Sequence, residues 1–288
     1  MSAAAAAMMI DPPLLQQRVR ELPALPRATL EALRALRDEG ADNERCAELV
    51  GRDQVLTARV LRLANSAFYG VPGRVASIRD AVSLLGRRAL ASLLTLAMAR
   101  AQFDARACPG FLQGAFWRHA LASAVAARTL ARELHADEDG AFTCGLLHDI
   151  GKLALAVHFP EQMSRAMRWQ REGDRCQPLA ETALLGTDHA AVGAAVARQW
   201  RLPDAVVQVI ATHHAPQPGA GGAPSLADIV HCADAISHAL DVAGDPDDCV
   251  PTIDPGAWQR VGLPAPTVLR LFEETERAVA GLAAELEP

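Results

Sequence analysis

Seven side chains between residues 119 and 234 have the types and the order of a divalent-metal site. They are histidines and aspartates that occur singly or as adjacent pairs, namely His119, His148, Asp149, His189, His213, His214 and Asp234. Imidazole and carboxylate groups are ligands of Fe, Mn, Zn and Mg. Two such ions about 3.5–4 Å apart can activate a water molecule and clamp a phosphate group. We therefore expect these side chains to line one cleft and to bind a divalent metal.

Each histidine taken alone also has a purely structural explanation. The chain has nine histidines, and four of them, His135, His158, His231 and His238, are scattered outside the pattern. A single helical histidine is more often a surface or packed residue than a ligand. The metal interpretation therefore depends on the order of the set and not on any one member.

The elements that carry these residues are expected to be helices. The sequence is rich in Ala, Leu and Arg, and only 4% of its residues are aromatic, whereas sheets favour β-branched and aromatic side chains. The predicted fold class is all-α. Asp42 and Ser77 are candidate N-caps. A long helix is expected over roughly 111–134, and another from near Asp137 through the His148-Asp149 pair.

The best internal boundary is the stretch 103–110, which contains Cys-Pro-Gly. We expect a tail at 1–13, an N-terminal helical part at 14–105 and a second helical part, with the metal set, at 106–288. The two parts are expected to pack together as one multi-helix bundle.

Charge and cysteine content restrict the classes of partner and compartment. The net charge of −6 gives no global basic field to attract nucleic acid, so a DNA-binding function, based on arginines on helix faces, is the weakest of three hypotheses. The six cysteines form no CxxC pair, which indicates reduced thiols and a cytoplasmic protein. No uncharged apolar run is long enough to predict a membrane span.

Two sets of motifs resemble known families. In the second half, Phe-Trp-Arg-His119, Gly145-Leu-Leu-His148-Asp149-Ile-Gly-Lys152 and Ala233-Asp234 resemble the H…HD…D signature of the HD superfamily. In the first half, Leu22-Pro-Ala-Leu-Pro26, Leu-Ala-Asn65-Ser-Ala-Phe-Tyr-Gly70 and Ala-Val-Ser-Leu-Leu-Gly86 resemble HDOD proteins more specifically. The resemblance covers about residues 20–240.

The resemblance implies a bacterial-type signalling output module, which in that family is often fused to receiver or cyclic-di-GMP domains. The additional His189, His213 and His214 resemble ligands of the HD-GYP branch, which hydrolyses cyclic di-GMP at a two-metal site. In that branch Lys152 would lie near the substrate phosphate, and the equally weighted alternative is a surface lysine that flanks a helix. The Gly-Tyr-Pro loop is absent, because residues 215–224 contain neither Tyr nor a charge.

We therefore expect a response-regulator-like signal-transduction module that acts through protein partners and could bind a divalent metal or a nucleotide. The alternative is a metal-dependent phosphohydrolase of the HD superfamily, in which Asp149 and Lys152 are the catalytic candidates. For the Asn65–Gly70 segment we favour a structural role over ligand binding, with Asn65 and Ser66 capping a helix end and Phe68 and Tyr69 packed into the groove between the two halves.

Overall fold

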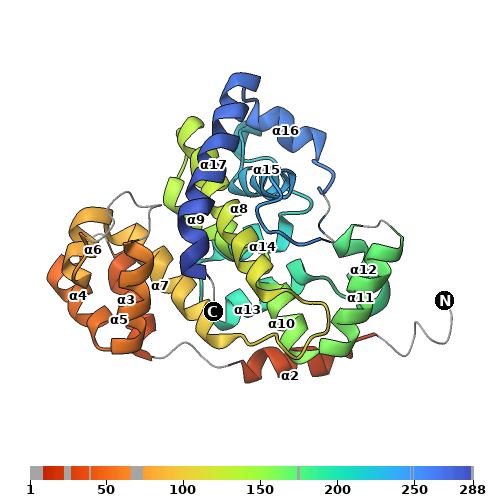
Figure 1. The fold of residues 1–288 in the computed structure, drawn as a ribbon, viewed down its shortest axis with the longest axis horizontal. Coiled ribbons are helices and arrows are strands. Elements are labelled where there is room, and N and C mark those ends of the chain that lie inside the picture. The colour runs from red at the N-terminus through yellow and green to blue at the C-terminus, as the bar shows by residue number, and fades with distance from the viewer. Residues whose placement is uncertain are drawn as a thin grey trace. The chain divides into compact units, whose positions relative to one another are not determined.

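The computed structural model describes residues 9–22, 27–38, 40–65, 74–173, 176–246, 248 and 250–286. Every regular element within these residues is a helix (Figure 1), which confirms the all-α prediction. The expected proline-rich stretch at 23–26 and the segment 66–73, with Phe68 and Tyr69, lie outside the described residues. The described residues cluster into two compact units.

One unit contains the described parts of residues 24–102 together with the end of the last helix. Its helices are α3 (Arg27–Arg37), α4 (Asn43–Gly51), α5 (Gln54–Ala64), α6 (Ile78–Leu85) and α7 (Arg87–Gln102). Asp42 caps α4 by accepting a hydrogen bond from the Glu44 backbone N–H. Ser77 begins α6 with a capping box that it shares with Asp80. Both predicted N-caps are confirmed, and α7, buried along most of its length, contacts α3, α5 and α6.

The other unit contains the described parts of residues 1–23 and 103–275. Its helices are α2 (Pro12–Glu21), α8 (Gln113–Glu133), α9 (Glu138–Leu147), α10 (Ile150–His158), α11 (Pro160–Glu172), α12 (Gln177–Leu185), α13 (His189–Gln199), α14 (Asp204–Thr212), η2 (Ala220–Gly222), α15 (Leu226–Ala239), α16 (Pro255–Val261) and the first half of α17 (Ala265–Leu286). Helix α8 packs against α9 and α15, and α13 packs against α10 and α14. These contacts bring together the helix segments and helix ends that carry the predicted metal set.

The expected continuous helix through His148 and Asp149 is broken in the structure. Asp137 caps its start as predicted, but α9 ends at Leu147 and α10 begins at Ile150. Asp149 leaves the helical conformation with φ −97° and ψ 8°. Adjacent side chains on an unbroken helix diverge by about 100°. The break therefore lets both side chains of the pair point at one place.

Close approach of α10 and α13 depends on two glycines that face each other. A β-carbon on Gly151 would overlap the carbonyl oxygen of His189 and lie 2.6 Å from the backbone nitrogen of Gly193. Only a residue without a side chain allows backbones to approach this closely. The Gly151–Gly193 contact thus sets the distance between the start of α10, next to Asp149, and the start of α13, at His189.

The stretch Glu138–His158 is the one described segment that is long and apolar enough to cross a membrane, and 83% of its most apolar 18-residue window is buried inside the protein. Such burial is typical of a core helix in a soluble protein.

Candidate metal centre

All seven predicted side chains meet inside the second unit. His119 lies in the middle of α8, and His148 and Asp149 form the break between α9 and α10. The others are contributed by the start of α13, the end of α14 and the middle of α15, namely His189, His213, His214 and Asp234. Their ligand atoms form two neighbouring groups, in each of which all atoms lie within 4.8 Å of one another. The predicted convergence is therefore observed, and their role as metal ligands stays a prediction.

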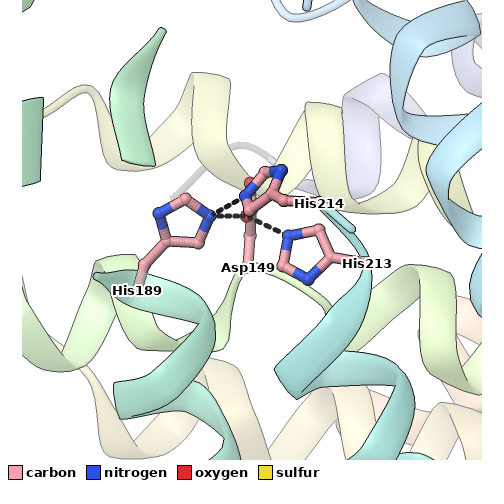
Figure 2. A group of neighbouring side chains, drawn as sticks. All are labelled: Asp149, His189, His213 and His214. Carbon is pink, nitrogen blue, oxygen red and sulfur yellow. Dashed lines mark hydrogen bonds and ion pairs between the residues drawn. The ribbon is translucent and has the colours of Figure 1, made fainter. Parts of the chain in front are cut away.

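The first group, called the His189 group, consists of Asp149, His189, His213 and His214 (Figure 2). The Nε2 atom of His189 lies 3.1 Å from Asp149 Oδ1 and 2.7 Å from His214 Nε2. His213 Nε2 lies 3.7 Å from the same Asp149 oxygen. Three ring nitrogens and one carboxylate oxygen thus surround one small volume.

The second group, called the Asp234 group, consists of His119, His148 and Asp234. Asp234 Oδ1 lies 3.0 Å from His119 Nε2 and 3.3 Å from His148 Nε2, and the two Nε2 atoms are 3.3 Å apart. The second oxygen of Asp149, Oδ2, lies 3.3 Å from His148 Nε2. Asp149 therefore directs one oxygen at each group.

These residues fit divalent ions. His119, His148, Asp149, His189, His213 and Asp234 are buried. Four of their polar atoms make no contact of good hydrogen-bond geometry with the described residues, namely both oxygens of Asp149, Nε2 of His213 and Oδ1 of Asp234. Lys152 Nζ and ring nitrogens of the cluster nevertheless lie near the two carboxylates. Buried polar atoms without partners are costly. Ligands at about 2.0–2.2 Å from a shared ion lie roughly 3 Å apart, which is the spacing in both groups.

The electrostatics give the members of the cluster different protonation states. Burial, the largest influence, lowers the pKa of His148 and of His189, but Asp149 raises that of His148 to about 10, and Glu181 and Asp149 raise that of His189 to about 9. An ion would therefore have to displace a proton from each of these two rings.

Burial is the largest influence on Asp149 and by itself raises its pKa, but His148 and Lys152 help to hold the pKa of this carboxyl well below its ordinary value. Burial, and next the neighbouring His148, lowers the pKa of His213 to about 3. An ionised carboxylate and a neutral imidazole are the forms that coordinate an ion.

A pocket of about 710 Å³, part of it open to solvent, lies against the cluster. His119, Asp149 and Lys152 line it together with an apolar wall that includes Phe111 and Phe116. Lys152 Nζ lies 2.6 Å from Asp149 Oδ2. The cluster is therefore reached from a pocket that combines a lysine with an apolar wall.

Two residues of the site were missed by sequence reasoning. His238, which the sequence placed among the scattered histidines, lines the pocket. Its ring centroid lies 4.2 Å from that of His119 and its Nδ1 lies 2.5 Å from Asp248 Oδ1. Its spacing of four residues from Asp234 on one helix was the available signal. Glu181 is fully buried behind His189, and no sequence pattern marks it.

The comparisons agree with the class that the fold and site define, a helical domain of the HD type. The chain belongs to the HDOD family, because the HDOD domain matches residues 22–216. Asp234 and His238 lie beyond the matched range. The family assignment made from the motifs is confirmed.

Several known proteins are similar to this chain. An uncharacterized protein of Treponema pallidum (strain Nichols) is 29% identical over 209 residues, which are 69% of this chain and 39% of that protein. The chain therefore spans about two fifths of the length of this curated relative.

Among solved structures, a provisionally named phosphohydrolase from Shewanella amazonensis SB2B is 28% identical with a TM-score of 0.66, covering 95% of this chain and 98% of its own. An HDOD domain protein with unknown function from Geobacter sulfurreducens is 26% identical with a TM-score of 0.69, covering 95% of both chains. A provisionally named signal transduction protein from Marinobacter aquaeolei VT8, 24% identical, shares the fold with a TM-score of 0.76 over 99% of this chain and 64% of its own.

Proposed function

We propose that this chain is a signal-transduction module whose second unit binds two divalent ions, one at the His189 group and one at the Asp234 group. The observation that carries the proposal is the state of Asp149. Both of its oxygens are buried and each faces one group of imidazoles, while Lys152 Nζ lies 2.6 Å from Oδ2. A carboxylate in that position is suited to bridge two ions.

The pocket beside the cluster suits a phosphorylated ligand such as a nucleotide. When bound, divalent ions supply Lewis acidity to a phosphoryl group. Lys152 and Arg171 line the pocket and can attract the negative charge. The neighbouring Phe111 and Phe116, with ring centroids 5.8 Å apart and tilted by 36°, offer an apolar wall for the remainder of the ligand. Ligand and metal would then regulate contacts with a protein partner.

A regulatory role draws support from the relatives. The match to the Treponema protein covers only 39% of that protein, so there the module is joined to further sequence. A module of this kind acts by changing its contacts with a neighbouring domain or a partner protein. The Marinobacter neighbour, whose name refers to signal transduction, supports the shared fold.

Metal analysis of purified protein tests the proposal. Wild-type protein prepared without chelator should hold close to two equivalents of a transition-metal ion. Asp149→Ala should lose most of both, since it removes an oxygen from each group, and His148→Ala should lose mainly the ion of the Asp234 group. His135→Asn, at an exposed histidine outside the cluster, is the matched control. Equal metal content in all four proteins would refute the metal centre.

A metal-dependent phosphohydrolase is the second candidate. It is favoured by the position of Lys152, which reaches Asp149 at the wall of an open pocket. In this case Asp149 would hold the ions and Lys152 would hold the phosphoester in line with its attacking group.

Cyclic di-GMP is a poor candidate for its substrate. The loop 215–224, which would have to hold this large substrate, has no Tyr and no charged side chain. A Gly- and Pro-rich loop loses conformational entropy on binding and offers few contacts in return. Protein loaded with manganese should therefore not hydrolyse cyclic di-GMP at about 1 per second, the low end of ordinary enzymes. Such turnover, abolished by Asp149→Ala, would favour the enzyme over the regulatory module.

A further inference from the structure

Glu181, in the middle of α12, is a carboxylic acid with no exposed surface. Its Oε2 atom accepts a hydrogen bond from the backbone N–H of His189 at 2.7 Å and lies 2.6 Å from Nδ1 of the same residue. Its Oε1 atom accepts from the side-chain amide of Gln177 at 2.8 Å. Buried carboxylates are rare unless they are fully paired. Glu181 is paired twice to one histidine of the metal centre.

The other buried histidines of the cluster have weaker partners at the same ring position. Nδ1 of His148 lies 2.7 Å from the Gly145 carbonyl oxygen, and Nδ1 of His213 lies 2.8 Å from the Ile210 carbonyl oxygen. Nδ1 of His119 lies 2.9 Å from the Ser237 hydroxyl. Among these four histidines, His189 alone has a carboxylate beside its Nδ1 atom.

The position of Glu181 determines which nitrogen of His189 is available. Oε2 already accepts a hydrogen bond from the backbone N–H of His189. We infer that the same oxygen also accepts from Nδ1, which then carries the ring proton. The lone pair of His189 then lies on Nε2, which faces Asp149 Oδ1 at 3.1 Å and His214 Nε2 at 2.7 Å. A carboxylate behind a histidine ligand fixes its ring and makes its other nitrogen a stronger donor.

We propose that Glu181 is a positioning residue that makes the His189 group the more strongly donating half of the metal centre. This inference rests on the proposed metal function. It adds that the two groups differ in how strongly their ligands donate to the ion. Glu181 acts through His189 and has no direct role at the ion. Gln177, which lines the pocket, holds the second oxygen of Glu181. The wall of the ligand pocket is therefore linked to the His189 group through two hydrogen bonds.

Zinc titration of the full chain against a competing chelator tests the proposal. Glu181→Gln keeps the shape of the side chain and removes its charge. It should lower the affinity of the His189 group for its ion by about 10–100-fold. The affinity of the Asp234 group should stay within about twofold of the wild-type value. Asp228→Asn is the matched control, because Asp228 is an equally buried carboxylate in the same unit, paired with Arg260 and Ser225 away from the cluster. It should bind both ions as wild type does.

Three results would contradict the proposal. If Glu181→Gln binds both ions with wild-type affinity, Glu181 does not position His189. If Glu181→Gln and Asp228→Asn lower the zinc affinity of both groups equally, the role of Glu181 is only structural. If wild-type protein binds no zinc, the metal centre and this inference fail together, whereas the first two results leave the metal centre intact.

A measurement on the wild-type protein decides the matter even if Glu181→Gln does not fold. Nitrogen-15 NMR of the histidine rings in the zinc-loaded chain should show that His189 carries its proton on Nδ1. An unprotonated Nδ1 would overturn the proposal.

Discussion

At the scale of single residues, bound ions would compensate the buried negative charge of Asp149, which is otherwise costly. Asp149 is 1% exposed, and without metal its nearest compensating cation is Lys152, 2.6 Å away. Removing one partner of a buried ion pair leaves the other uncompensated, which costs about 3–5 kcal/mol. The contribution of Lys152 to stability must therefore depend on whether ions are bound beside Asp149.

Lys152→Met should accordingly destabilise the metal-free protein more than the metal-loaded protein. We expect a loss of about 3–5 kcal/mol in the free energy of unfolding in the presence of chelator and a clearly smaller loss in excess zinc. Urea unfolding under both conditions measures the difference. Arg45→Met, which removes an exposed ion pair with Glu48, should cost at most about 1 kcal/mol under both conditions. An identical cost for Lys152→Met with and without zinc would speak against Asp149 as a ligand.

The cysteines provide an independent test of burial. Cys176 is exposed, whereas burial raises the pKa of Cys108 to about 11 and that of Cys232 to about 12. Thiolates are the reactive form. A raised pKa means that at pH 8 roughly a thousandth or less of these two thiols is ionised. Iodoacetamide at pH 8 should label Cys176 first, as peptide mass spectrometry can show, while denatured protein should label all of them. Labelling of Cys232 as fast as Cys176 would contradict the described core.

At the scale of elements, the distance between α10 and α13 is the feature on which the site depends most. Gly151→Ala would push its new methyl group into the start of α13. We expect a stability loss of about 1–3 kcal/mol from overpacking, together with weaker binding of the ion between Asp149 and His189. A β-carbon on Gly51, in α4, would meet no described atom within 4 Å. Gly51→Ala should therefore be neutral or stabilising by up to about 1 kcal/mol.

Calorimetry and zinc titration of both glycine variants check this expectation. Unchanged metal binding in Gly151→Ala would show that the approach of the two helices does not position the site.

The elements that could be predicted from sequence are those with local signals. Asp42 and Ser77 began helices as predicted because an N-cap satisfies backbone donors two or three residues away. The break at His148-Asp149 was not predicted, since the residues after it, from Ile150 onward, continue a helical pattern. Glu181 was not predicted either, because its contact with His189 exists only after α12 and α13 pack together.

At the scale of the whole molecule, the chain passes between the two units at residues 23–24, 102–103 and 275–276. The last helix, α17, begins in one unit and ends in the other. The convergence of the metal set was predictable from motif order alone, while the arrangement of helices that produces it was not. The order of the candidate ligands can be read directly from the sequence. The packing of the helices cannot, because it depends on contacts between segments that are distant in the sequence.

We expect the two units to unfold together in one cooperative transition. The short N-terminal helices have small apolar faces, and helices of this kind need a second layer to cover them. Calorimetry and circular dichroism should therefore give coincident transitions for the full chain. Two separated transitions, or a stable isolated fragment 1–105, would contradict this expectation.

The most direct test of the metal centre is anomalous X-ray diffraction from crystals of protein purified without chelator and loaded with zinc. Two anomalous peaks are expected, one on each side of Asp149, about 3.5–4 Å apart. One peak should contact His189, and the other should contact Asp234. Crystals without a peak at either position, in which Lys152 still pairs with Asp149, would contradict the account.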